Sequence, residues 1–228
     1  MCDTALMTFV DYPLPGCVEH VLASEVGAPS ATVLHTCLVL DTITQLDMLR
    51  LPTHLFYTPR GRRRSLEVWL GTGYSYALQR GASFEQRLAH AFASLFDKGY
   101  GRVVWVSSNA PDLPFAYLTL GVHELTRADA VFGPGQHDTP YLIGLTRDSF
   151  RPPLLEAARS CPQLALAMEG TGARVKELSR WDIVESVRDL HALRRRAGAT
   201  VRRYSLTLSY LRNREHILGA QASNEADE

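Results

Sequence analysis

The stretch RVVWVSSNAPDL, residues 102–113, contains the clearest structural signal in the sequence. Its first five residues, RVVWV, form an apolar run that is typical of a strand buried on both faces in a parallel sheet. The turn-forming residues SSNAPDL follow at once, so polar side chains stand where that strand ends. Ligands of open parallel sheets bind beyond the carboxyl ends of the strands. This stretch therefore predicts both a central strand and one border of a binding site.

Strand and helix patterns alternate on both sides of this stretch. We expect further strands at residues 5–10, 53–58, 74–79, 128–132 and 141–145, and helices at residues 30–50, 84–96 and 115–125. Helical segments between strands indicate crossover connections and a mostly parallel sheet. The predicted fold is α/β, a three-layer α/β/α sandwich around a mixed sheet.

From about residue 151 onward the sequence predicts helices and no further strands. Helices are expected at residues 154–159, 173–178, 183–196 and 201–218, followed by a polar tail at 219–228. No internal repeat and no Gly/Ser-rich linker divides the chain. We therefore expect one domain over residues 1–218, with a helical carboxyl-terminal part.

Composition excludes several classes of protein. The 228 residues include 24 Lys and Arg and 24 Asp and Glu, so the chain lacks the positive field that sequence-independent nucleic-acid binding requires. Four cysteines without a C-x-x-C pair suggest neither a zinc site nor a disulfide framework. No apolar run approaches the length of a membrane helix and no leader is evident. We expect a soluble, cytoplasmic protein with no nucleic-acid or membrane partner.

Several segments together resemble a bacterial family of small glycosyltransferase-A-type proteins, the nucleotide-diphospho-sugar transferases, some of them associated with arsenosugar biosynthesis. Related folds serve molybdenum-cofactor and phospholactate nucleotidyltransferases. The resemblance runs in consistent order over roughly residues 5–190. The matching segments are the F-x-x-x-P-x-P-G-x-V loop (Phe9, Pro13, Pro15, Gly16, Val18), residues 84–88, residues 108–113, and Gly133-Pro134 leading to residues 141–145.

The resemblance implies a small-molecule substrate, such as a nucleotide-sugar, held through its phosphates. Members of that family typically carry a lysine two residues after the first-strand Phe and a Lys-Thr-Arg triplet after the P-G-x-V loop. Here these positions are Asp11 and Glu19-His20-Val21. Each charge-assisted phosphate contact contributes about 1.5–3 kcal/mol, so losing three cations would weaken such binding severely.

The resemblance also implies a divalent cation, Mg²⁺ or Mn²⁺, held by carboxylates that bridge it to phosphates. The aspartate of the family's G-S-D-x-P segment is replaced by Asn109, which offers only a neutral carbonyl. His137-Asp138-Thr139-Pro140 stands where the family has D-G-G-Y. Asp182 alone occupies a matching position, in the family's D-x-D segment. The implied metal ligands are therefore Asp182 and Asn109.

One hypothesis is a working transferase with a rebuilt site. In it His137, Asp138 and Glu19 carry the catalytic role, Pro15 and Gly16 shape the loop, and the substrate contacts are Asp11, His20, Ser108, Asn109 and Asp112. Turn geometry alone accounts for Pro15 and Gly16. Asp112 is equally placed to cap the helix expected at residues 115–125.

Two other hypotheses stay open. Asp11, Glu19, His20, His137, Asp138 and Asp182 could converge on one crevice, where carboxylates and imidazoles suit acid/base work or a transition metal. They could equally be solvated loop residues. In the third hypothesis the protein is a catalytically silent homologue that serves as a binding or scaffold subunit, with another protein or a second copy of itself, a homodimer, as its partner.

Overall fold

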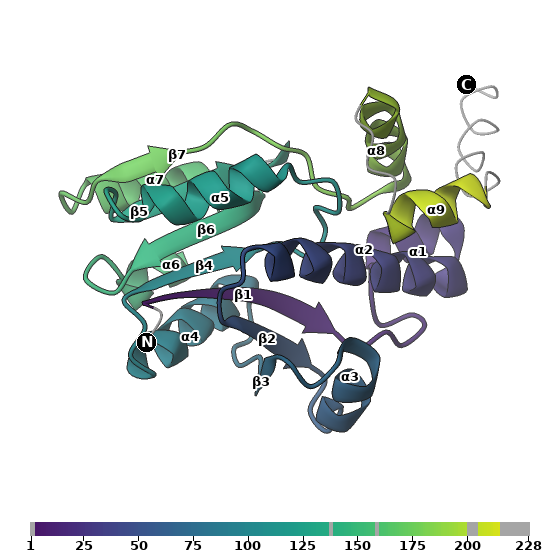
Figure 1. Cartoon of the computed structure of the whole chain (residues 1–228), viewed down its shortest axis with the longest axis horizontal. Helices are drawn as coiled ribbons and strands as arrows, with labels where there is room; N and C mark the ends of the chain where they lie inside the picture. The colour runs from purple at the N-terminus through teal and green to yellow at the C-terminus, as the bar shows by residue number, and fades with distance from the viewer. Residues whose placement is uncertain (1–2, 137–138, 158–159, 200–204, 215–228) are drawn as a thin grey trace.

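The computed structural model describes residues 3–136, 139–157, 160–199 and 205–214. Within these residues the centre of the molecule is a seven-stranded sheet in the order β3-β2-β1-β4-β6-β5-β7 (Figure 1). Its strands are β1 (Thr4–Asp11), β2 (Thr53–Thr58), β3 (Ser75–Leu78), β4 (Arg102–Val106), β5 (Ala130–Pro134), β6 (Pro140–Thr146) and β7 (Val175–Glu177).

The sheet is mixed and mostly parallel. Strand β6 runs antiparallel to its neighbours β4 and β5, whereas β1, β2, β3 and β4 pair in parallel and β7 pairs in parallel with β5. Asp11 at the end of β1 stands opposite Thr58 at the end of β2. These carboxyl ends therefore open onto the same edge of the sheet, as the predicted fold requires.

Helices cover both faces of the sheet (Figure 1). They are α1 (His20–Val26), α2 (Ala28–Met48), α3 (Arg63–Leu70), α4 (Phe84–Asp97), α5 (Phe115–Glu124), α6 (Pro152–Ala157), α7 (Cys161–Glu169), α8 (Val187–Ala199) and α9 (Leu206–Arg212). Helices α2, α3 and α5 pack on one face, and α4, α6 and α7 pack on the other. The three-layer prediction is confirmed. Among the described residues no helix is long and apolar enough to cross a membrane.

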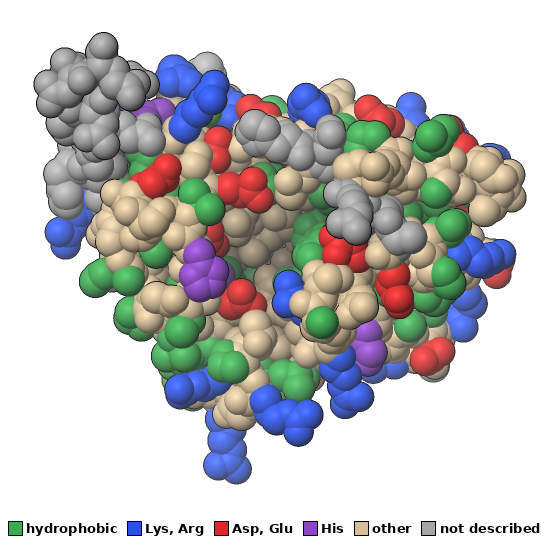
Figure 2. Space-filling view, turned by 180° about the vertical axis from the view of Figure 1, so that it is seen from behind, with side chains coloured by type: hydrophobic (Ala, Val, Ile, Leu, Met, Phe, Trp, Pro, Cys, Tyr) green, Lys and Arg blue, Asp and Glu red, His purple; other side chains and the backbone are tan. Residues whose placement is uncertain are grey.

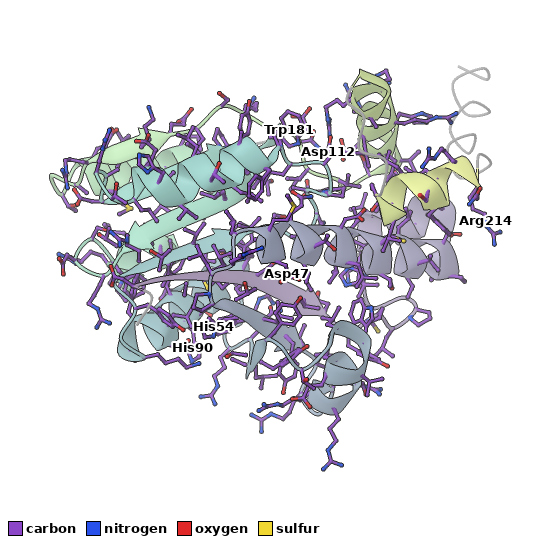
Figure 3. The ribbon with its side chains drawn as sticks, in the orientation of Figure 1. Asp47, His54, His90, Asp112, Trp181 and Arg214 are labelled. Atoms are coloured by element: carbon purple, nitrogen blue, oxygen red, sulfur yellow. The ribbon has the colours of Figure 1, made fainter. Side chains whose placement is uncertain are left out.

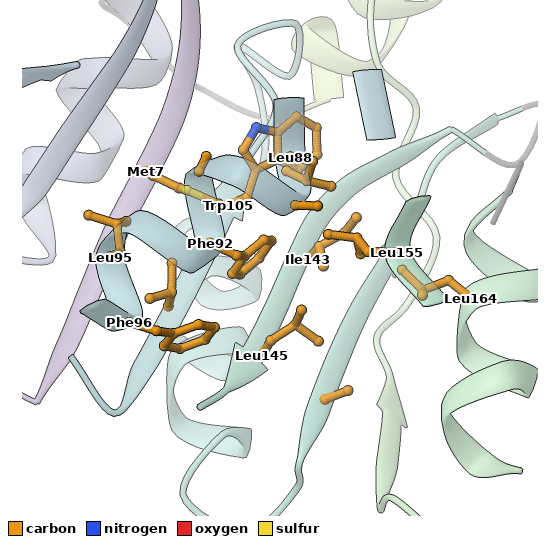
Figure 4. Packing of buried hydrophobic residues seen from close by; sticks show 14 of the residues in the cluster. Met7, Leu88, Phe92, Leu95, Phe96, Trp105, Ile143, Leu145, Leu155 and Leu164 are labelled. Carbon is orange, nitrogen blue, oxygen red and sulfur yellow. The ribbon is translucent and has the colours of Figure 1, made fainter. Parts of the chain in front are cut away.

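The largest apolar cluster lies between the sheet and α4. Phe92 and Phe96 of α4 pack there with side chains from β1, β4 and β6 (Figure 4). Trp105, which the sequence predicts as a core residue, is 4% exposed and belongs to this cluster. Burying large aromatic side chains stabilises the fold by about 1.5–3 kcal/mol each. The amphipathic pattern of residues 84–96 therefore fixes α4 under the sheet.

A separate cluster joins the carboxyl-terminal helices to the amino-terminal half of α2. Leucines of α1, α2, α8 and α9 pack together there, away from the sheet (Figure 1). Buried Asp41 of α2 accepts hydrogen bonds from the backbone N–H groups of Leu206 (2.8 Å) and Thr207 (3.0 Å) at the start of α9. A carboxylate at a helix amino terminus satisfies donors that have no partner within the helix. Helix α9 is thereby fastened to α2.

Some predicted elements are wrong. Residues 173–178, expected as a helix, contain the short strand β7, because the backbone of Val175–Glu177 pairs with the open edge of β5. Charged residues such as Lys176 and Glu177 are typical of an edge strand. The helix expected from residue 183 begins only at Val187. Of the helix expected at 201–218, the described part is α9.

Three helices were not expected, and α7 (Cys161–Glu169) is one of them. Helix α1 begins at His20, inside the predicted loop. Helix α3 begins at Arg63, inside the basic run RGRRR of residues 60–64, a charge pattern typical of a solvated loop, and its Leu66 is buried against α2. Helices α1 and α3 are short, and a helix of seven or eight residues depends on tertiary packing more than on its own propensity.

Candidate functional site

A cleft of about 320 Å³ opens where the carboxyl ends of β1 and β4 meet the first turn of α4. The space-filling view from behind shows the molecule hollowed near its centre, with Asp and Glu side chains along the border (Figure 2). A volume of this size suits a small ligand or part of a larger one. The lining residues are Phe9, Asp11, Glu19, His35, Gln79, Phe84, Arg87, Trp105, Ser107, Ser108, Asn109, Thr139, Ile183 and Glu185.

Helix α2 holds the loop that follows β4. Thr42 donates a hydrogen bond to the Ser108 carbonyl (3.1 Å), and the Gln45 side-chain amide donates to the Pro111 carbonyl (2.6 Å). From the other side, the Val184 N–H donates to the Asn109 carbonyl (2.7 Å). These bonds satisfy the backbone of a buried turn. Ser108 and Asn109 are therefore presented to the cleft on a fixed loop.

Glu19 and His35 form a buried ion pair at one wall of the cleft. His35 Nδ1 lies 3.0 Å from Glu19 Oε1, and the two side chains are 4% and 10% exposed. The Asn109 amide is 3.5 Å from Glu19 Oε2. Glu19 also has a φ of 49°, in the left-handed region that costs a non-glycine residue energy. The ion pair with His35 holds this strained residue at the start of α1.

The partners of His35 fix its charge. Nδ1 faces the Glu19 carboxylate and Nε2 lies 2.9 Å from the Asp11 carbonyl oxygen, so both ring nitrogens must donate. Burial alone would lower the pKa of His35, but the hydrogen bond and charge of Glu19 and the Asp11 carbonyl outweigh it, and the pKa is raised. The imidazolium therefore neutralises Glu19 and holds the end of β1.

Asp11 is the carboxylate at the end of the first strand. Its pKa is raised by burial, against the lowering influence of His35, Gln79 and Arg87. The Gln79 side-chain amide lies 3.3 Å from Asp11 Oδ1 and donates also to the Phe56 carbonyl (3.0 Å). A carboxylate with a raised pKa accepts a proton more readily than an ordinary surface aspartate. Asp11 is therefore a partly buried carboxylate at the cleft that holds a proton to a higher pH than an exposed aspartate does.

Arg87 brings a positive charge into the cleft from the first turns of α4. Ser83 caps this helix, accepting from the Gln86 N–H at 3.2 Å. Gly81 allows the chain to pass close to the start of α4. Its φ is +135°, and a Cβ there would lie 2.7 Å from the backbone nitrogen of Arg87. The lining carboxylates are Asp11, Glu19 and Glu185. The cleft lining thus combines three carboxylates with two basic side chains, Arg87 and His35.

Two buried N–H donors of the lining have no acceptor within the described residues. They are Nε of Arg87 and Nε1 of Trp105. Trp105 packs edge-on against Phe9 and Phe84, with ring centroids 6.1 and 5.3 Å away, and the three rings form an aromatic wall. Buried donors are almost always satisfied in native proteins. Both residues line the cleft, but these two nitrogens are themselves closed to solvent, so the residues contribute a positive charge and an aromatic surface to the lining.

Four of the residues predicted from the sequence come together in this cleft. Asp11, Glu19, Ser108 and Asn109 all belong to its lining, although they come from two loops almost a hundred residues apart. Pro15, Gly16 and His20 are exposed and lie outside the lining. His137 and Asp138 lie outside the described residues.

Asp112 and Asp182 lie outside the cleft lining. Both bind Arg196: Asp112 Oδ2 accepts from Nε at 2.9 Å, and Asp182 Oδ2 accepts from Nη1 at 3.4 Å. Asp112 also accepts from the Trp181 indole N–H (3.2 Å). The capping role considered for Asp112 is wrong, because Pro114 is the N-cap of α5 and no side chain caps it.

The side chains that complete the cleft were not predicted from the sequence. His35 sits among apolar residues of α2, and a buried histidine in an apolar helix pattern is the signal that could have identified it. Gln79 follows β3, at the same sheet edge as Asp11. Arg87 belongs to the segment of residues 84–88 that carries the resemblance. The loop of residues 181–186 supplies Glu185 where a helix was expected.

The described residues do not fit the divalent cation that the resemblance implies. No group of three or more His, Cys, Asp or Glu side chains is arranged there to hold a metal ion. The oxygens of Glu19 face His35 and Asn109, and Asp182 is paired with Arg196 away from the lining. Hard cations require several free oxygen ligands. No catalytic step is therefore assigned to a metal.

Comparison with known proteins gives a consistent picture. The family model of DUF2064, described as an uncharacterised protein conserved in bacteria, matches residues 40–160, more than half of the chain. A Desulfovibrio desulfuricans G20 protein assigned to the nucleotide-diphospho-sugar transferases has 30% identity and a TM-score of 0.90, over 96% of this chain and 98% of that one. No curated protein matches.

More distant structures share the fold. Rv0371c of Mycobacterium tuberculosis H37Rv in complex with manganese has 15% identity and a TM-score of 0.51, covering 84% of this chain and 97% of that one. CMP:2-keto-3-deoxy-manno-octonic acid synthetase complexed with CTP has 11% identity and a TM-score of 0.54, covering 87% and 100%. With its sheet, its cleft and these matches, the chain belongs to the DUF2064 family and has the nucleotide-diphospho-sugar transferase fold.

Proposed function

We propose that this protein is a transferase that acts on a small molecule and takes its activated group from a nucleotide-sugar. The observation that carries the proposal is the place of Arg87, a cationic residue in the lining of the cleft at the carboxyl ends of β1 and β4, in a chain with the nucleotide-diphospho-sugar transferase fold. Phosphate oxygens are strong acceptors for a guanidinium. In this proposal Arg87 binds the diphosphate that relatives bind through the cations of the first loop.

Asp11 is the general base in this proposal. Its raised pKa and its place at the end of β1 suit proton removal from an acceptor hydroxyl group. His35 and Glu19 neutralise one another, so they act as positioning residues that hold the Asp11 backbone. Ser108 and Asn109, fixed on the loop after β4, are the proposed contacts to the sugar hydroxyls.

Nucleotide-sugar binding tests the proposal. Isothermal titration calorimetry with UDP-, GDP-, CDP- and dTDP-sugars, with and without Mg²⁺ or Mn²⁺, should identify a bound donor. Arg87→Ala should weaken it by roughly 10- to 150-fold, the equivalent of about 1.5–3 kcal/mol for a charge-assisted contact. Arg80→Ala is the matched control, because Arg80 is exposed on the neighbouring loop and outside the lining. Equal affinity in Arg87→Ala and the wild type contradicts the proposal.

A catalytically silent homologue is the second candidate function. The observation that favours it is the pairing of Glu19 with His35 and of Asp182 with Arg196. Two carboxylates that the resemblance would use for catalysis or metal binding are therefore engaged in ion pairs. Asp11→Asn separates the two candidates. If the protein is a transferase, this variant binds the nucleotide-sugar but loses transfer, as measured by release of the nucleoside diphosphate. If the wild type binds but releases nothing with any acceptor, the silent candidate is favoured.

A further inference from the structure

A second cavity, of about 330 Å³, lies on the opposite side of the loop that follows β4. Its walls are the first turn of α5, the end of α8, the first turns of α9 and Trp181, and it shares no lining residue with the cleft. Asp112 and Trp181 lie side by side between α5 and α8 (Figure 3). The lining residues are Asp112, Pro114, Phe115, Ala116, Trp181, Arg196, Ala197 and Leu208.

The charged side chains in the wall of this cavity pair with one another. Arg196 binds both oxygens of Asp112 (2.9 and 3.3 Å) and contacts Asp182, so one guanidinium faces two carboxylates. The guanidinium also lies over the Trp181 ring, 5.4 Å from its centroid. Arg196 is the cation of the lining, and because Asp112 and Asp182 already share it, little positive charge remains to attract an anionic ligand. The charge balance therefore excludes the phosphate chemistry proposed for the cleft.

The remaining wall is apolar and partly aromatic. Phe115, Pro114, Ala116, Ala197 and Leu208 contribute no charged group. Binding sites for small organic molecules are mostly apolar, with a few polar groups that fix orientation. Flat rings pack favourably on indole and phenyl surfaces. We infer that this cavity is a second ligand site, and that its occupant is a small, uncharged aromatic molecule.

Ligand-observed saturation-transfer NMR with 2-naphthol as the probe tests this inference. The wild type should give a saturable signal. Ala116→Trp, which places an indole in the cavity from the exposed first turn of α5, should reduce it at least tenfold. Ala197→Trp fills the cavity from the α8 wall and should do the same, so the test does not depend on one variant folding. Leu120→Trp is the matched control, since Leu120 lies on α5, is 40% exposed and is not in the lining.

The charge of the probe provides a second test. The anion 2-naphthoate, nearly the same in shape, should bind at least tenfold more weakly than 2-naphthol. The inference is overturned by the absence of a 2-naphthol signal in the wild type, by an unchanged signal in both filled variants, or by equal binding of 2-naphthoate. It is independent of the cleft, because Ala116→Trp should leave Arg87-dependent nucleotide-sugar binding unchanged.

Discussion

His35 and His54 are almost equally buried, at 3% and 4% exposure, yet their pKa values move in opposite directions. His35 lies at the carboxyl edge of the sheet, between the Glu19 carboxylate and the Asp11 carbonyl, and its pKa is raised. His54 lies near the amino end of β2. Burial and the charge of Lys98 lower its pKa to about 4.

Hydrogen-bond partners explain the contrast. His54 Nε2 lies 3.1 Å from the Tyr100 hydroxyl, and its Nδ1 has no partner among the described residues, so nothing there stabilises an imidazolium. His35 has an acceptor at each nitrogen. The histidine at the edge that carries the cleft is therefore charged, whereas the histidine at the other end of the sheet is neutral. Burial alone does not decide the charge of a histidine; its partners do.

The largest loss of stability should come from replacing His35, whose positive charge balances Glu19 at the cleft. His35→Leu leaves the buried Glu19 carboxylate without its counter-charge and with Asn109 as its hydrogen-bond partner among the described residues, and the free energy of unfolding should fall by about 3 kcal/mol. Urea denaturation at pH 6 measures this. Adding Glu19→Gln to His35→Leu should recover part of the loss, because the uncompensated charge is gone. A loss that the second substitution does not reduce would contradict the ion-pair account.

The pH dependence of stability should separate the two histidines. His35 has a raised pKa, so its contribution to stability is complete below its ordinary value of 6.5 and is lost as pH rises through the folded-state pKa. His54 has a lowered pKa, so its contribution is complete above 6.5 and is lost as pH falls toward about 4.

Two variants test which histidine causes each pH-dependent loss of stability. Glu19→Gln should flatten the alkaline side, and His54→Phe should flatten the acid side. Urea denaturation of the wild type and both variants between pH 4 and 9 measures the slopes. If all three profiles run parallel, the two histidines do not carry the assigned charges.

The smallest effect should come from His54→Phe at neutral pH. The ring volume is similar, an unpartnered Nδ1 is removed, and the half-buried Tyr100 hydroxyl can bond to water instead. The free energy of unfolding at pH 7.5 should change by less than about 1 kcal/mol. A loss comparable with that of His35→Leu would mean that His54 has a role the neutral ring does not explain. Thermal unfolding of the two variants side by side provides this comparison.

The sequence by itself determined the fold class. The apolar runs of β1, β2, β4, β5 and β6, the mostly buried helix α2 and the amphipathic helix α4 follow from local periodicity, because burial on two faces or one leaves a pattern in the chain. It also placed Asp11, Glu19, Ser108 and Asn109 near one another, since parallel strands end at a common edge.

Only the tertiary structure decided what those residues can do. The imidazole that neutralises Glu19 comes from α2, and the cleft arginine comes from α4, neither of them adjacent in sequence to the loops they face. Arg196, on α8, likewise pairs with Asp112 and Asp182. Both carboxylates therefore lie outside the cleft, where the resemblance implied substrate and metal contacts for them. Charge depends on distances between side chains through space, and no local pattern in the sequence specifies those distances.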